Sequence, residues 1–306
     1  MKIFKYGDTI GSNSAVTIGM FDGVHLGHQQ LIRRTVEIGD LFHLTPLVYT
    51  FANHPLKEKK RDFITVLEER LYLFELYGIG TAYLAELTNG FMAMRAKDFI
   101  ENELIEHLNA RAVIVGENFR FGKNREGDIN LLKNIGRGLG ICVEVIPVLK
   151  LGGEAVSSSL ICDYIKRGNM EGSYRLLGHH FFLTGNVAKG KGLGRKIGFP
   201  TANLNYLNGS KILPKTGIYI TSGELDGKLL PSVTNIGYNP TFDTDNRIKV
   251  EIHFFDMSED LYGKEIRLYF LERIRDEKKF ETASALREAI KKDVQVAKTY
   301  FSKINN

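Results

Sequence analysis

Along the first half of the chain, short apolar segments alternate with stretches in which apolar residues recur at every third or fourth position. The apolar segments predict buried strands at residues 15–20, 44–51, 112–116 and 141–146. The helical spacing predicts helices from Gly27, from an N-cap at Thr65, and over residues 96–108, 159–167 and 170–177. Strands that alternate with helices predict an α/β domain with a parallel sheet and crossover helices.

The pattern changes after residue 180. Helical periodicity disappears, and turn-forming glycines and asparagines separate short β-rich segments at residues 217–221, 249–255 and 266–271. This pattern predicts a small antiparallel β-barrel. Apolar residues at helical spacing between Phe280 and Phe301 predict a C-terminal helix. We therefore predict two domains, residues 1–180 and 181–306, joined near residues 178–184.

Composition places the chain among globular proteins. Its 306 residues suffice for two cores, and 43% of them are apolar and 25% charged. No stretch approaches the roughly 20 apolar residues of a membrane helix, and the first residues lack the apolar segment of a secretory signal. Two cysteines give neither a disulfide framework nor a CxxC zinc motif, so a reducing cytoplasm is expected. The net charge of +5 suits small phosphorylated ligands as well as nucleic acid.

The segment GMFDGVHLGH at residues 19–28 follows the first predicted strand and opens the first predicted helix. The carboxyl end of such a strand is where open α/β sheets bind ligands, and a helix N-terminus there attracts phosphate. His25 and His28 could hydrogen-bond a phosphoryl oxygen and stabilise the charge that develops during transfer. The alternatives are that both histidines cap the turn, or that they bind a metal with His54. A metal would lack a carboxylate or thiol at suitable spacing.

A second glycine- and lysine-rich segment lies at residues 185–204, GNVAKGKGLGRKIGFPTANL. It nearly matches a Walker A loop, but Gly192 stands where Ser or Thr is required and no helix follows, so we exclude a P-loop. The segment can still hold phosphates through backbone N–H groups. Thr201 and Asn203 supply the oxygen ligands that Mg²⁺ prefers. Glu251 shares a face of the predicted strand at residues 249–255 with His253, and could act as a base toward an alcohol.

The first half resembles the nucleotidyltransferase superfamily, in the form carried by FMN adenylyltransferases. FDGVHLGH matches its HxGH signature, and TFANHP (50–55), VGENFRFG (115–122) and VSSSLI (156–161) follow in family order. The resemblance implies a Rossmann-like domain in which His25 and His28 are catalytic. It implies ATP contacts from Gly19, Phe21, Asp22, Gly27, Ser157, Ser158 and Ser159. It implies flavin contacts from His54, Asn118, Phe119, Arg120 and Phe121.

Asn53 and Asn118 stand where the family pattern has proline and aspartate, and a third departure follows the VSSSLI motif. The arginine expected after the VSSSLI motif is Cys162 here, and a thiol cannot grip a polyphosphate as a guanidinium does. Lys166, one helical turn further on, is the preferred substitute, because Arg167 faces another side of the predicted helix.

The second half resembles the riboflavin kinases. Residues 185–204 match the signature GxVxxGxxxGRxxGFPTANL at every defined position, and SVTNIGYNPTF (232–242), VEIHFF (250–255), DLYG (260–263) and RDEKKF (275–280) follow in family order. The resemblance implies ATP contacts from Gly190, Gly192, Gly194, Lys196, Thr201 and Asn203. It implies that Thr201 and Asn203 bind Mg²⁺, that Glu251 is the base, and that Arg275 and Glu277 lie on the flavin side.

Together the two halves resemble the bacterial bifunctional riboflavin kinases/FMN adenylyltransferases (FAD synthetases). This resemblance implies a transferase that uses riboflavin, FMN, ATP and Mg²⁺, with small molecules rather than nucleic acid or membranes as its partners. Two alternatives stay open. The protein could be mainly a riboflavin kinase, because Cys162 replaces the motif arginine, or a non-catalytic regulator that senses flavin.

Overall fold

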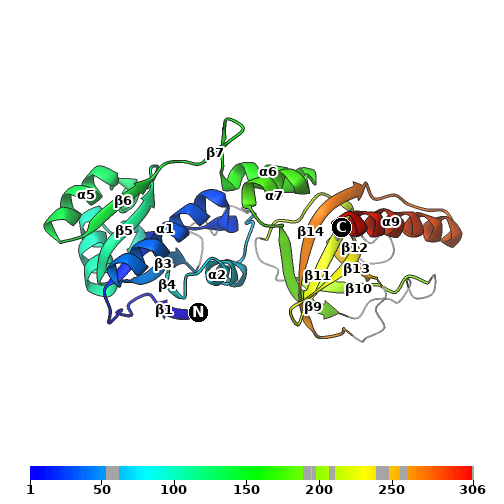
Figure 1. The fold of residues 1–306 in the computed structure, drawn as a ribbon, viewed down its shortest axis with the longest axis horizontal. Helices are drawn as coiled ribbons and strands as arrows, with labels where there is room; N and C mark the ends of the chain where they lie inside the picture. Colours follow the sequence, from blue (N-terminus) through cyan, green and yellow to red (C-terminus); the bar gives the residue numbers. More distant parts are fainter. Residues whose placement is uncertain are drawn as a thin grey trace. The chain divides into compact units, whose positions relative to one another are not determined.

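The structure is a computed structural model that describes residues 1–52, 62–188, 194, 198–206, 211–238, 248–255 and 261–304. The chain divides into two compact units, Met1–Ser158 and Ser159–Asn306. Each unit has its own sheet, and each is described by itself below (Figure 1). Within the described residues, no helix has the length and apolar character needed to cross a membrane.

The first unit is built on a six-stranded sheet in the order β1-β4-β3-β2-β5-β6, and every neighbouring pair in it is parallel. Its strands are β1 (Lys2–Lys5), β2 (Ser14–Ile18), β3 (Thr45–Phe51), β4 (Thr81–Ala85), β5 (Ala110–Gly116) and β6 (Cys142–Ile146). The predicted parallel α/β sheet is confirmed. The prediction missed β1 and β4, which together form one edge of the sheet.

Helices connect these strands and cover the sheet. They are η1 (Asp22–Val24), α1 (Leu26–Phe42), α2 (Leu67–Leu76), α3 (Asn89–Ala93), α4 (Ala96–Asp98), η2 (Phe99–His107), η3 (Lys123–Arg125) and α5 (Ile129–Gly138). A two-stranded hairpin of β7 (Lys150–Leu151) and β8 (Glu154–Ala155) follows β6. The helix predicted over residues 96–108 is one α-helical turn followed by a π-helix, in which Leu108 N–H donates to the Glu103 carbonyl oxygen.

Helix α2 begins later than predicted. Its N-cap is Val66 rather than Thr65, and Glu69 Oε2 accepts the Val66 N–H at 3.1 Å. The Thr65 hydroxyl does not cap the helix because it accepts the N–H of Gly23 at 2.8 Å. A contact across 42 residues of sequence therefore replaces the local cap, which periodicity alone cannot reveal.

The second unit is a closed antiparallel barrel in the order β10-β13-β12-β11-β14-β9. Its elements are α6 (Ser158–Arg167), whose first residue closes the first unit, α7 (Met170–Leu177), β9 (Phe182–Ala188), β10 (Ala202–Tyr206), β11 (Gly217–Leu225), β12 (Lys228–Tyr238), β13 (Ile248–Phe254), β14 (Glu265–Arg275) and α9 (Ala283–Ile304). Helix α9 packs Ala297 and Val294 against Ile218, Ile220 and Val233 on the barrel wall. The predicted barrel and C-terminal helix are confirmed.

Candidate functional site

The turn after β2 has a backbone that few residues adopt. Phe21 is left-handed with φ 52°, and Gly23 has φ 79°. A Cβ on Gly23 would lie 3.0 Å from the Ile64 side chain, so glycine is needed for conformation and for space. Strain of this kind tends to persist at functional sites. The turn delivers His25 to the N-cap position of α1, at the carboxyl end of a central parallel strand.

His25 and His28 form a stacked pair at this helix N-terminus. Their ring centroids are 3.6 Å apart with 16° between the planes, and His25 Nδ1 accepts the His28 N–H at 3.4 Å. The His25 side chain therefore caps α1, whereas His28 lies within the helix. Gly27 makes room for the pair, since a Cβ there would lie 3.3 Å from the His25 ring.

His28 carries a polar atom that the fold does not use. Its Nδ1 is buried and has no hydrogen-bond partner among the described residues. Burial, and then the neighbouring His25, lower the pKa of His28 well below its usual value. The ring is therefore neutral near pH 7 and retains hydrogen-bonding capacity. Buried polar groups are normally paired, so an orphan nitrogen beside a helix N-terminus fits a site for an oxygen-rich anion.

Two other motif residues hold the turn in place. Asp22 Oδ1 accepts the N–H groups of Ile64 at 2.9 Å and Thr65 at 3.0 Å. Ser158 Oγ donates to the Asp22 carbonyl oxygen at 2.9 Å, across 136 residues of sequence. Ser157 is half-buried and Ser159 exposed. Ser158 of the VSSSLI motif therefore contacts the HxGH turn, and Asp22 braces that turn through its carboxylate.

Sequence reasoning missed Arg70, which is 6% exposed on α2. Its guanidinium donates to the carbonyl oxygens of Met20 at 2.7 Å and Phe51 at 3.1 Å, and to Thr50 Oγ1 at 3.2 Å. The sequence contains a signal for the burial of Arg70. Arg70 lies three residues after Leu67 and four before Phe74, which places it on the apolar side of the predicted helix.

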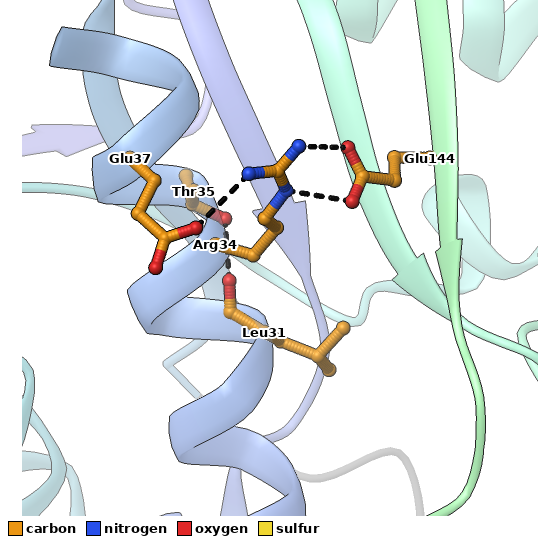
Figure 2. A network of polar contacts seen from close by, with 5 residues as sticks. All are labelled: Leu31, Arg34, Thr35, Glu37 and Glu144. Atoms are coloured by element: carbon orange, nitrogen blue, oxygen red, sulfur yellow. Dashed lines mark hydrogen bonds and ion pairs between the residues drawn. The ribbon is translucent and has the colours of Figure 1, made fainter. Parts of the chain in front are cut away.

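Helix α1, which is capped by His25 and contains His28, is also joined to β6 by a side-chain contact. Figure 2 shows the Arg34 guanidinium bound to both carboxylate oxygens of Glu144 on β6, at 2.6 and 3.0 Å, and to Glu37 at 3.0 Å. These neighbours raise the pKa of Arg34. A bidentate contact of this kind fixes the orientation of the two side chains as well as their distance.

The predicted flavin-side residues of the first unit follow β5. Asn118 and Arg120 are exposed, and Arg120 lies 3.6 Å from the Asp128 carboxylate. The rings of Phe119 and Phe121 stack with centroids 5.3 Å apart. Phe121 is buried in the core, whereas Phe119 is half-buried and is the better placed of the two to meet a flavin ring. His54 lies outside the described residues.

Within the described residues, no three His, Cys, Asp or Glu side chains converge as metal ligands would.

Cys162 and the two basic residues that follow it on α6 have different surroundings. Cys162 is half-buried on α6, Lys166 is exposed, and the Arg167 guanidinium pairs with Asp163 at 2.9 Å.

In the barrel, three polar residues lie in one row across adjacent strands. Asn203 on β10 lies opposite Glu251 on β13, and Glu251 lies opposite Asn235 on β12. Burial raises the pKa of Glu251; Lys249 opposes that rise and Glu277 adds to it. A carboxylate whose pKa is moved toward neutral is suited to accept a proton.

The segment before β10 is fixed near Glu251. His253 Nδ1 lies 2.8 Å from the Pro200 carbonyl oxygen, and the Phe199 N–H donates to the Gly194 carbonyl oxygen at 2.9 Å. A Cβ on Gly194 would overlap the Phe199 carbonyl oxygen and lie 3.2 Å from Thr201 Oγ1. The backbone of Gly194 thus lies close to the Thr201 hydroxyl. The predicted residues Gly190, Gly192 and Lys196 lie outside the described residues.

The two residues predicted on the flavin side of the barrel have different contacts. Arg275 donates to both carboxylate oxygens of Asp293 on α9, at 2.9 and 2.6 Å, and so anchors that helix. The Glu277 carboxylate lies against Gly237 of β12, where a Cβ would overlap it. Glu277 also adds to the raised pKa of Glu251, so its carboxylate lies near that residue.

Comparison with known proteins gives matches to both units. A sequence model of the FAD synthetase family matches residues 8–160, and one of the riboflavin kinase family matches residues 177–301. A bifunctional riboflavin kinase/FMN adenylyltransferase of Bacillus subtilis is 35% identical over 96% of this chain and 94% of its own length. The Escherichia coli K12 protein of the same name is 34% identical over 94% of this chain and 92% of its own.

A solved structure covers both units as well. A crystal structure from Streptococcus pneumoniae, described as a macrolide-efflux protein, has a TM-score of 0.88 and 28% identity. The match covers 97% of this chain and 99% of that one.

Proposed function

The chain belongs to the family of bifunctional riboflavin kinases/FMN adenylyltransferases, and we propose that its two halves divide the two reactions of flavin cofactor synthesis between them. Residues 181–306 phosphorylate riboflavin with ATP to give FMN. Residues 1–180 join FMN to the AMP part of a second ATP and release pyrophosphate. The protein is thus a transferase that makes FAD from riboflavin in two steps.

For the kinase step we propose Glu251 as the base. It takes the proton of the terminal ribityl hydroxyl while that oxygen attacks the γ-phosphorus and the bond to the departing ADP breaks. The burial that raises the Glu251 pKa, and the position of Glu251 directly beside Asn203, support this role.

The residues present fit Mg²⁺ in that site. Thr201 and Asn203 offer a hydroxyl and an amide oxygen, the kind of ligands Mg²⁺ accepts beside phosphates, and Asn203 lies directly opposite Glu251. Bound there, Mg²⁺ would neutralise charge on the ATP phosphates. Gly190, Gly192, Gly194 and Lys196 are the proposed partners of those phosphates, with Glu277 and Arg275 on the flavin side.

For adenylyl transfer we propose that His25 and His28 hold the α-phosphate of ATP. An FMN phosphate oxygen attacks that phosphorus, the new P–O bond forms, and pyrophosphate leaves with the electrons of the broken bond. The attacking phosphate is already ionised near pH 7, so the chain need only orient the reactants and stabilise charge. The buried, unpartnered Nδ1 of neutral His28 supports this role.

We propose that the turn at Gly19–Gly27 and the serines at residues 157–159 bind ATP. Phe119 with Asn118 and Arg120 would contact the flavin, and Asp22 would act through the turn that it braces. The substrates are small molecules, and the reducing cytoplasm stays our prediction for where the protein works.

The observation that carries the proposal is that one chain holds both family halves, each with its candidate site. The test supplies riboflavin, ATP and Mg²⁺ and follows products by chromatography. A bifunctional enzyme forms FMN and then FAD, and converts added FMN to FAD with release of pyrophosphate. FMN without FAD would leave a kinase alone, and tight flavin binding with neither product would indicate a regulator. The family match favours neither alternative.

A further inference from the structure

Arg70 is a buried cation whose hydrogen bonds to the described residues all go to uncharged oxygens. Its three acceptors are the carbonyl oxygens of Met20 and Phe51 and the hydroxyl of Thr50. Its Nε is buried and has no hydrogen-bond partner in the part of the chain that the structure describes. Burial is the main influence on the Arg70 pKa and lowers it, although Asp22 and Glu68 act in the opposite direction. A buried guanidinium without a directly bound carboxylate is unfavourable for folding, which suggests that the position serves function.

The three acceptors share a location. Met20 follows β2, while Thr50 and Phe51 end β3, and these two strands are parallel neighbours. Met20 belongs to the segment with His25 and His28, and Thr50 begins the TFANHP segment. One planar, multi-donor side chain therefore joins two motif segments at the carboxyl end of the sheet, where open α/β sheets bind ligands.

The rest of the α2 region contacts the same turn. The N–H groups of Ile64 and Thr65 bind Asp22, and the Phe74 ring meets the Phe21 ring edge-on at 5.5 Å. Because Phe21 and Gly23 have positive φ, the turn depends on such outside contacts to keep its shape. Arg70 differs from these contacts in reaching β3 as well as the turn.

We propose that Arg70 is a positioning residue for adenylyl transfer. It holds the ends of β2 and β3 together, so that the histidine pair keeps a fixed position relative to Thr50 and Phe51 when ATP binds at the histidine turn. The inference rests on the proposed function of the first half. It adds a residue outside the four motifs that carry the family resemblance in that half.

The central variant is Arg70→Lys, which keeps the charge but cannot bridge two strand ends. Misplacing reacting groups by about 1 Å can lower a rate about 10²-fold, so we expect kcat for FAD formation to fall by that order. The KM values for ATP and FMN should change less than kcat. Kinase turnover, measured on the same protein, should equal that of the wild type. Arg33→Met, which removes an exposed guanidinium from α1, should affect neither activity.

A folding control separates positioning from loss of stability. Leu104 is fully buried in the core of the first unit, and Leu104→Ala should destabilise that unit by leaving a cavity. Assayed well below its unfolding temperature, Leu104→Ala should keep its kcat for FAD formation. Hydrogen–deuterium exchange should be faster in Arg70→Lys than in the wild type for peptides that span residues 19–28 and 45–52.

Two results would overturn the inference: wild-type kcat for FAD formation in Arg70→Lys, or an equal loss of kcat in Leu104→Ala. A wild-type protein that makes no FAD would instead overturn the proposed function. In that case hydrogen–deuterium exchange would test the role of Arg70 by itself. Unchanged protection of residues 19–28 and 45–52 in Arg70→Lys would show that Arg70 does not position these segments.

Discussion

The two candidate sites of this protein are held together in different ways. In the barrel, Asn203, Glu251 and Asn235 are neighbours because strand pairing puts them in one row. In the first unit, the histidine turn is held by Asp22, Arg70 and Ser158, through contacts between distant parts of the chain. The barrel site is therefore positioned by backbone register, which tolerates side-chain change, whereas the adenylyl-transfer site depends on individual side chains.

We expect the largest effect from a substitution that removes the proposed base but keeps the row of three polar side chains in the barrel. Glu251→Gln should lower kinase kcat by about 10²–10⁴-fold, because the amide cannot accept the ribityl proton. Riboflavin binding, followed by the quenching of its fluorescence, should persist, and FAD formation from added FMN should stay at the wild-type rate. Glu265→Gln, at an exposed position of β14, is the matched control. Near-normal kinase turnover in Glu251→Gln would remove Glu251 from the mechanism.

The same contrast explains what the sequence could predict. Alternation in residues 249–255 places Glu251 and His253 on one face, and the structure confirms it, with Val250, Ile252 and Phe254 buried. Period-2 patterns are local, so they can be read from sequence. The sequence could place Arg70 on the apolar side of its helix, but it could not reveal the partners of Arg70 and Thr65, which lie 19 to 50 residues away.

The next largest expected effect is an increase in the activity of the first half of the chain. Cys162→Arg restores the residue that the family pattern has in its phosphate motif, and a guanidinium can bind a polyphosphate at two points. We expect the rate of FAD formation to rise by about 10²-fold, the smaller end of the range for one contact that stabilises transition-state charge. Cys142→Arg adds the same charge at an exposed position of β6 and should leave the rate unchanged. Equal rates in all three proteins would show that this site does not need the motif arginine.

The histidine turn should also make the first unit sensitive to acid. Burial, and then His25, keep the His28 pKa well below 6.5, so between that lowered value and about 6.5 the unfolded chain binds a proton that the folded unit does not. Stability is then fully present above about pH 6.5 and falls as the pH drops, by at most about 1.4 kcal/mol per pH unit. Thermal unfolding at pH 7.5 and 5.5 should show a smaller decrease for His28→Gln than for the wild type. An identical decrease in both proteins would assign the acid sensitivity to other groups.

The smallest expected effect compares two glycine turns, one in each unit. Gly23 and Gly227 have nearly equal φ values of 79° and 76°, so an alanine meets the same backbone strain of about 1 kcal/mol at either position. At Gly227, in the hairpin between β11 and β12, the new Cβ has nothing within 4 Å, and Gly227→Ala should cost no more than that strain. At Gly23 the Cβ would lie 3.0 Å from Ile64, so Gly23→Ala should cost about 1–3 kcal/mol and also slow FAD formation. Denaturant unfolding and the two activity assays measure both effects. If Gly23→Ala loses no more stability than Gly227→Ala, the histidine turn can adjust its backbone without loss of stability. The side chains that contact the turn would then contribute less to its shape than the contacts indicate.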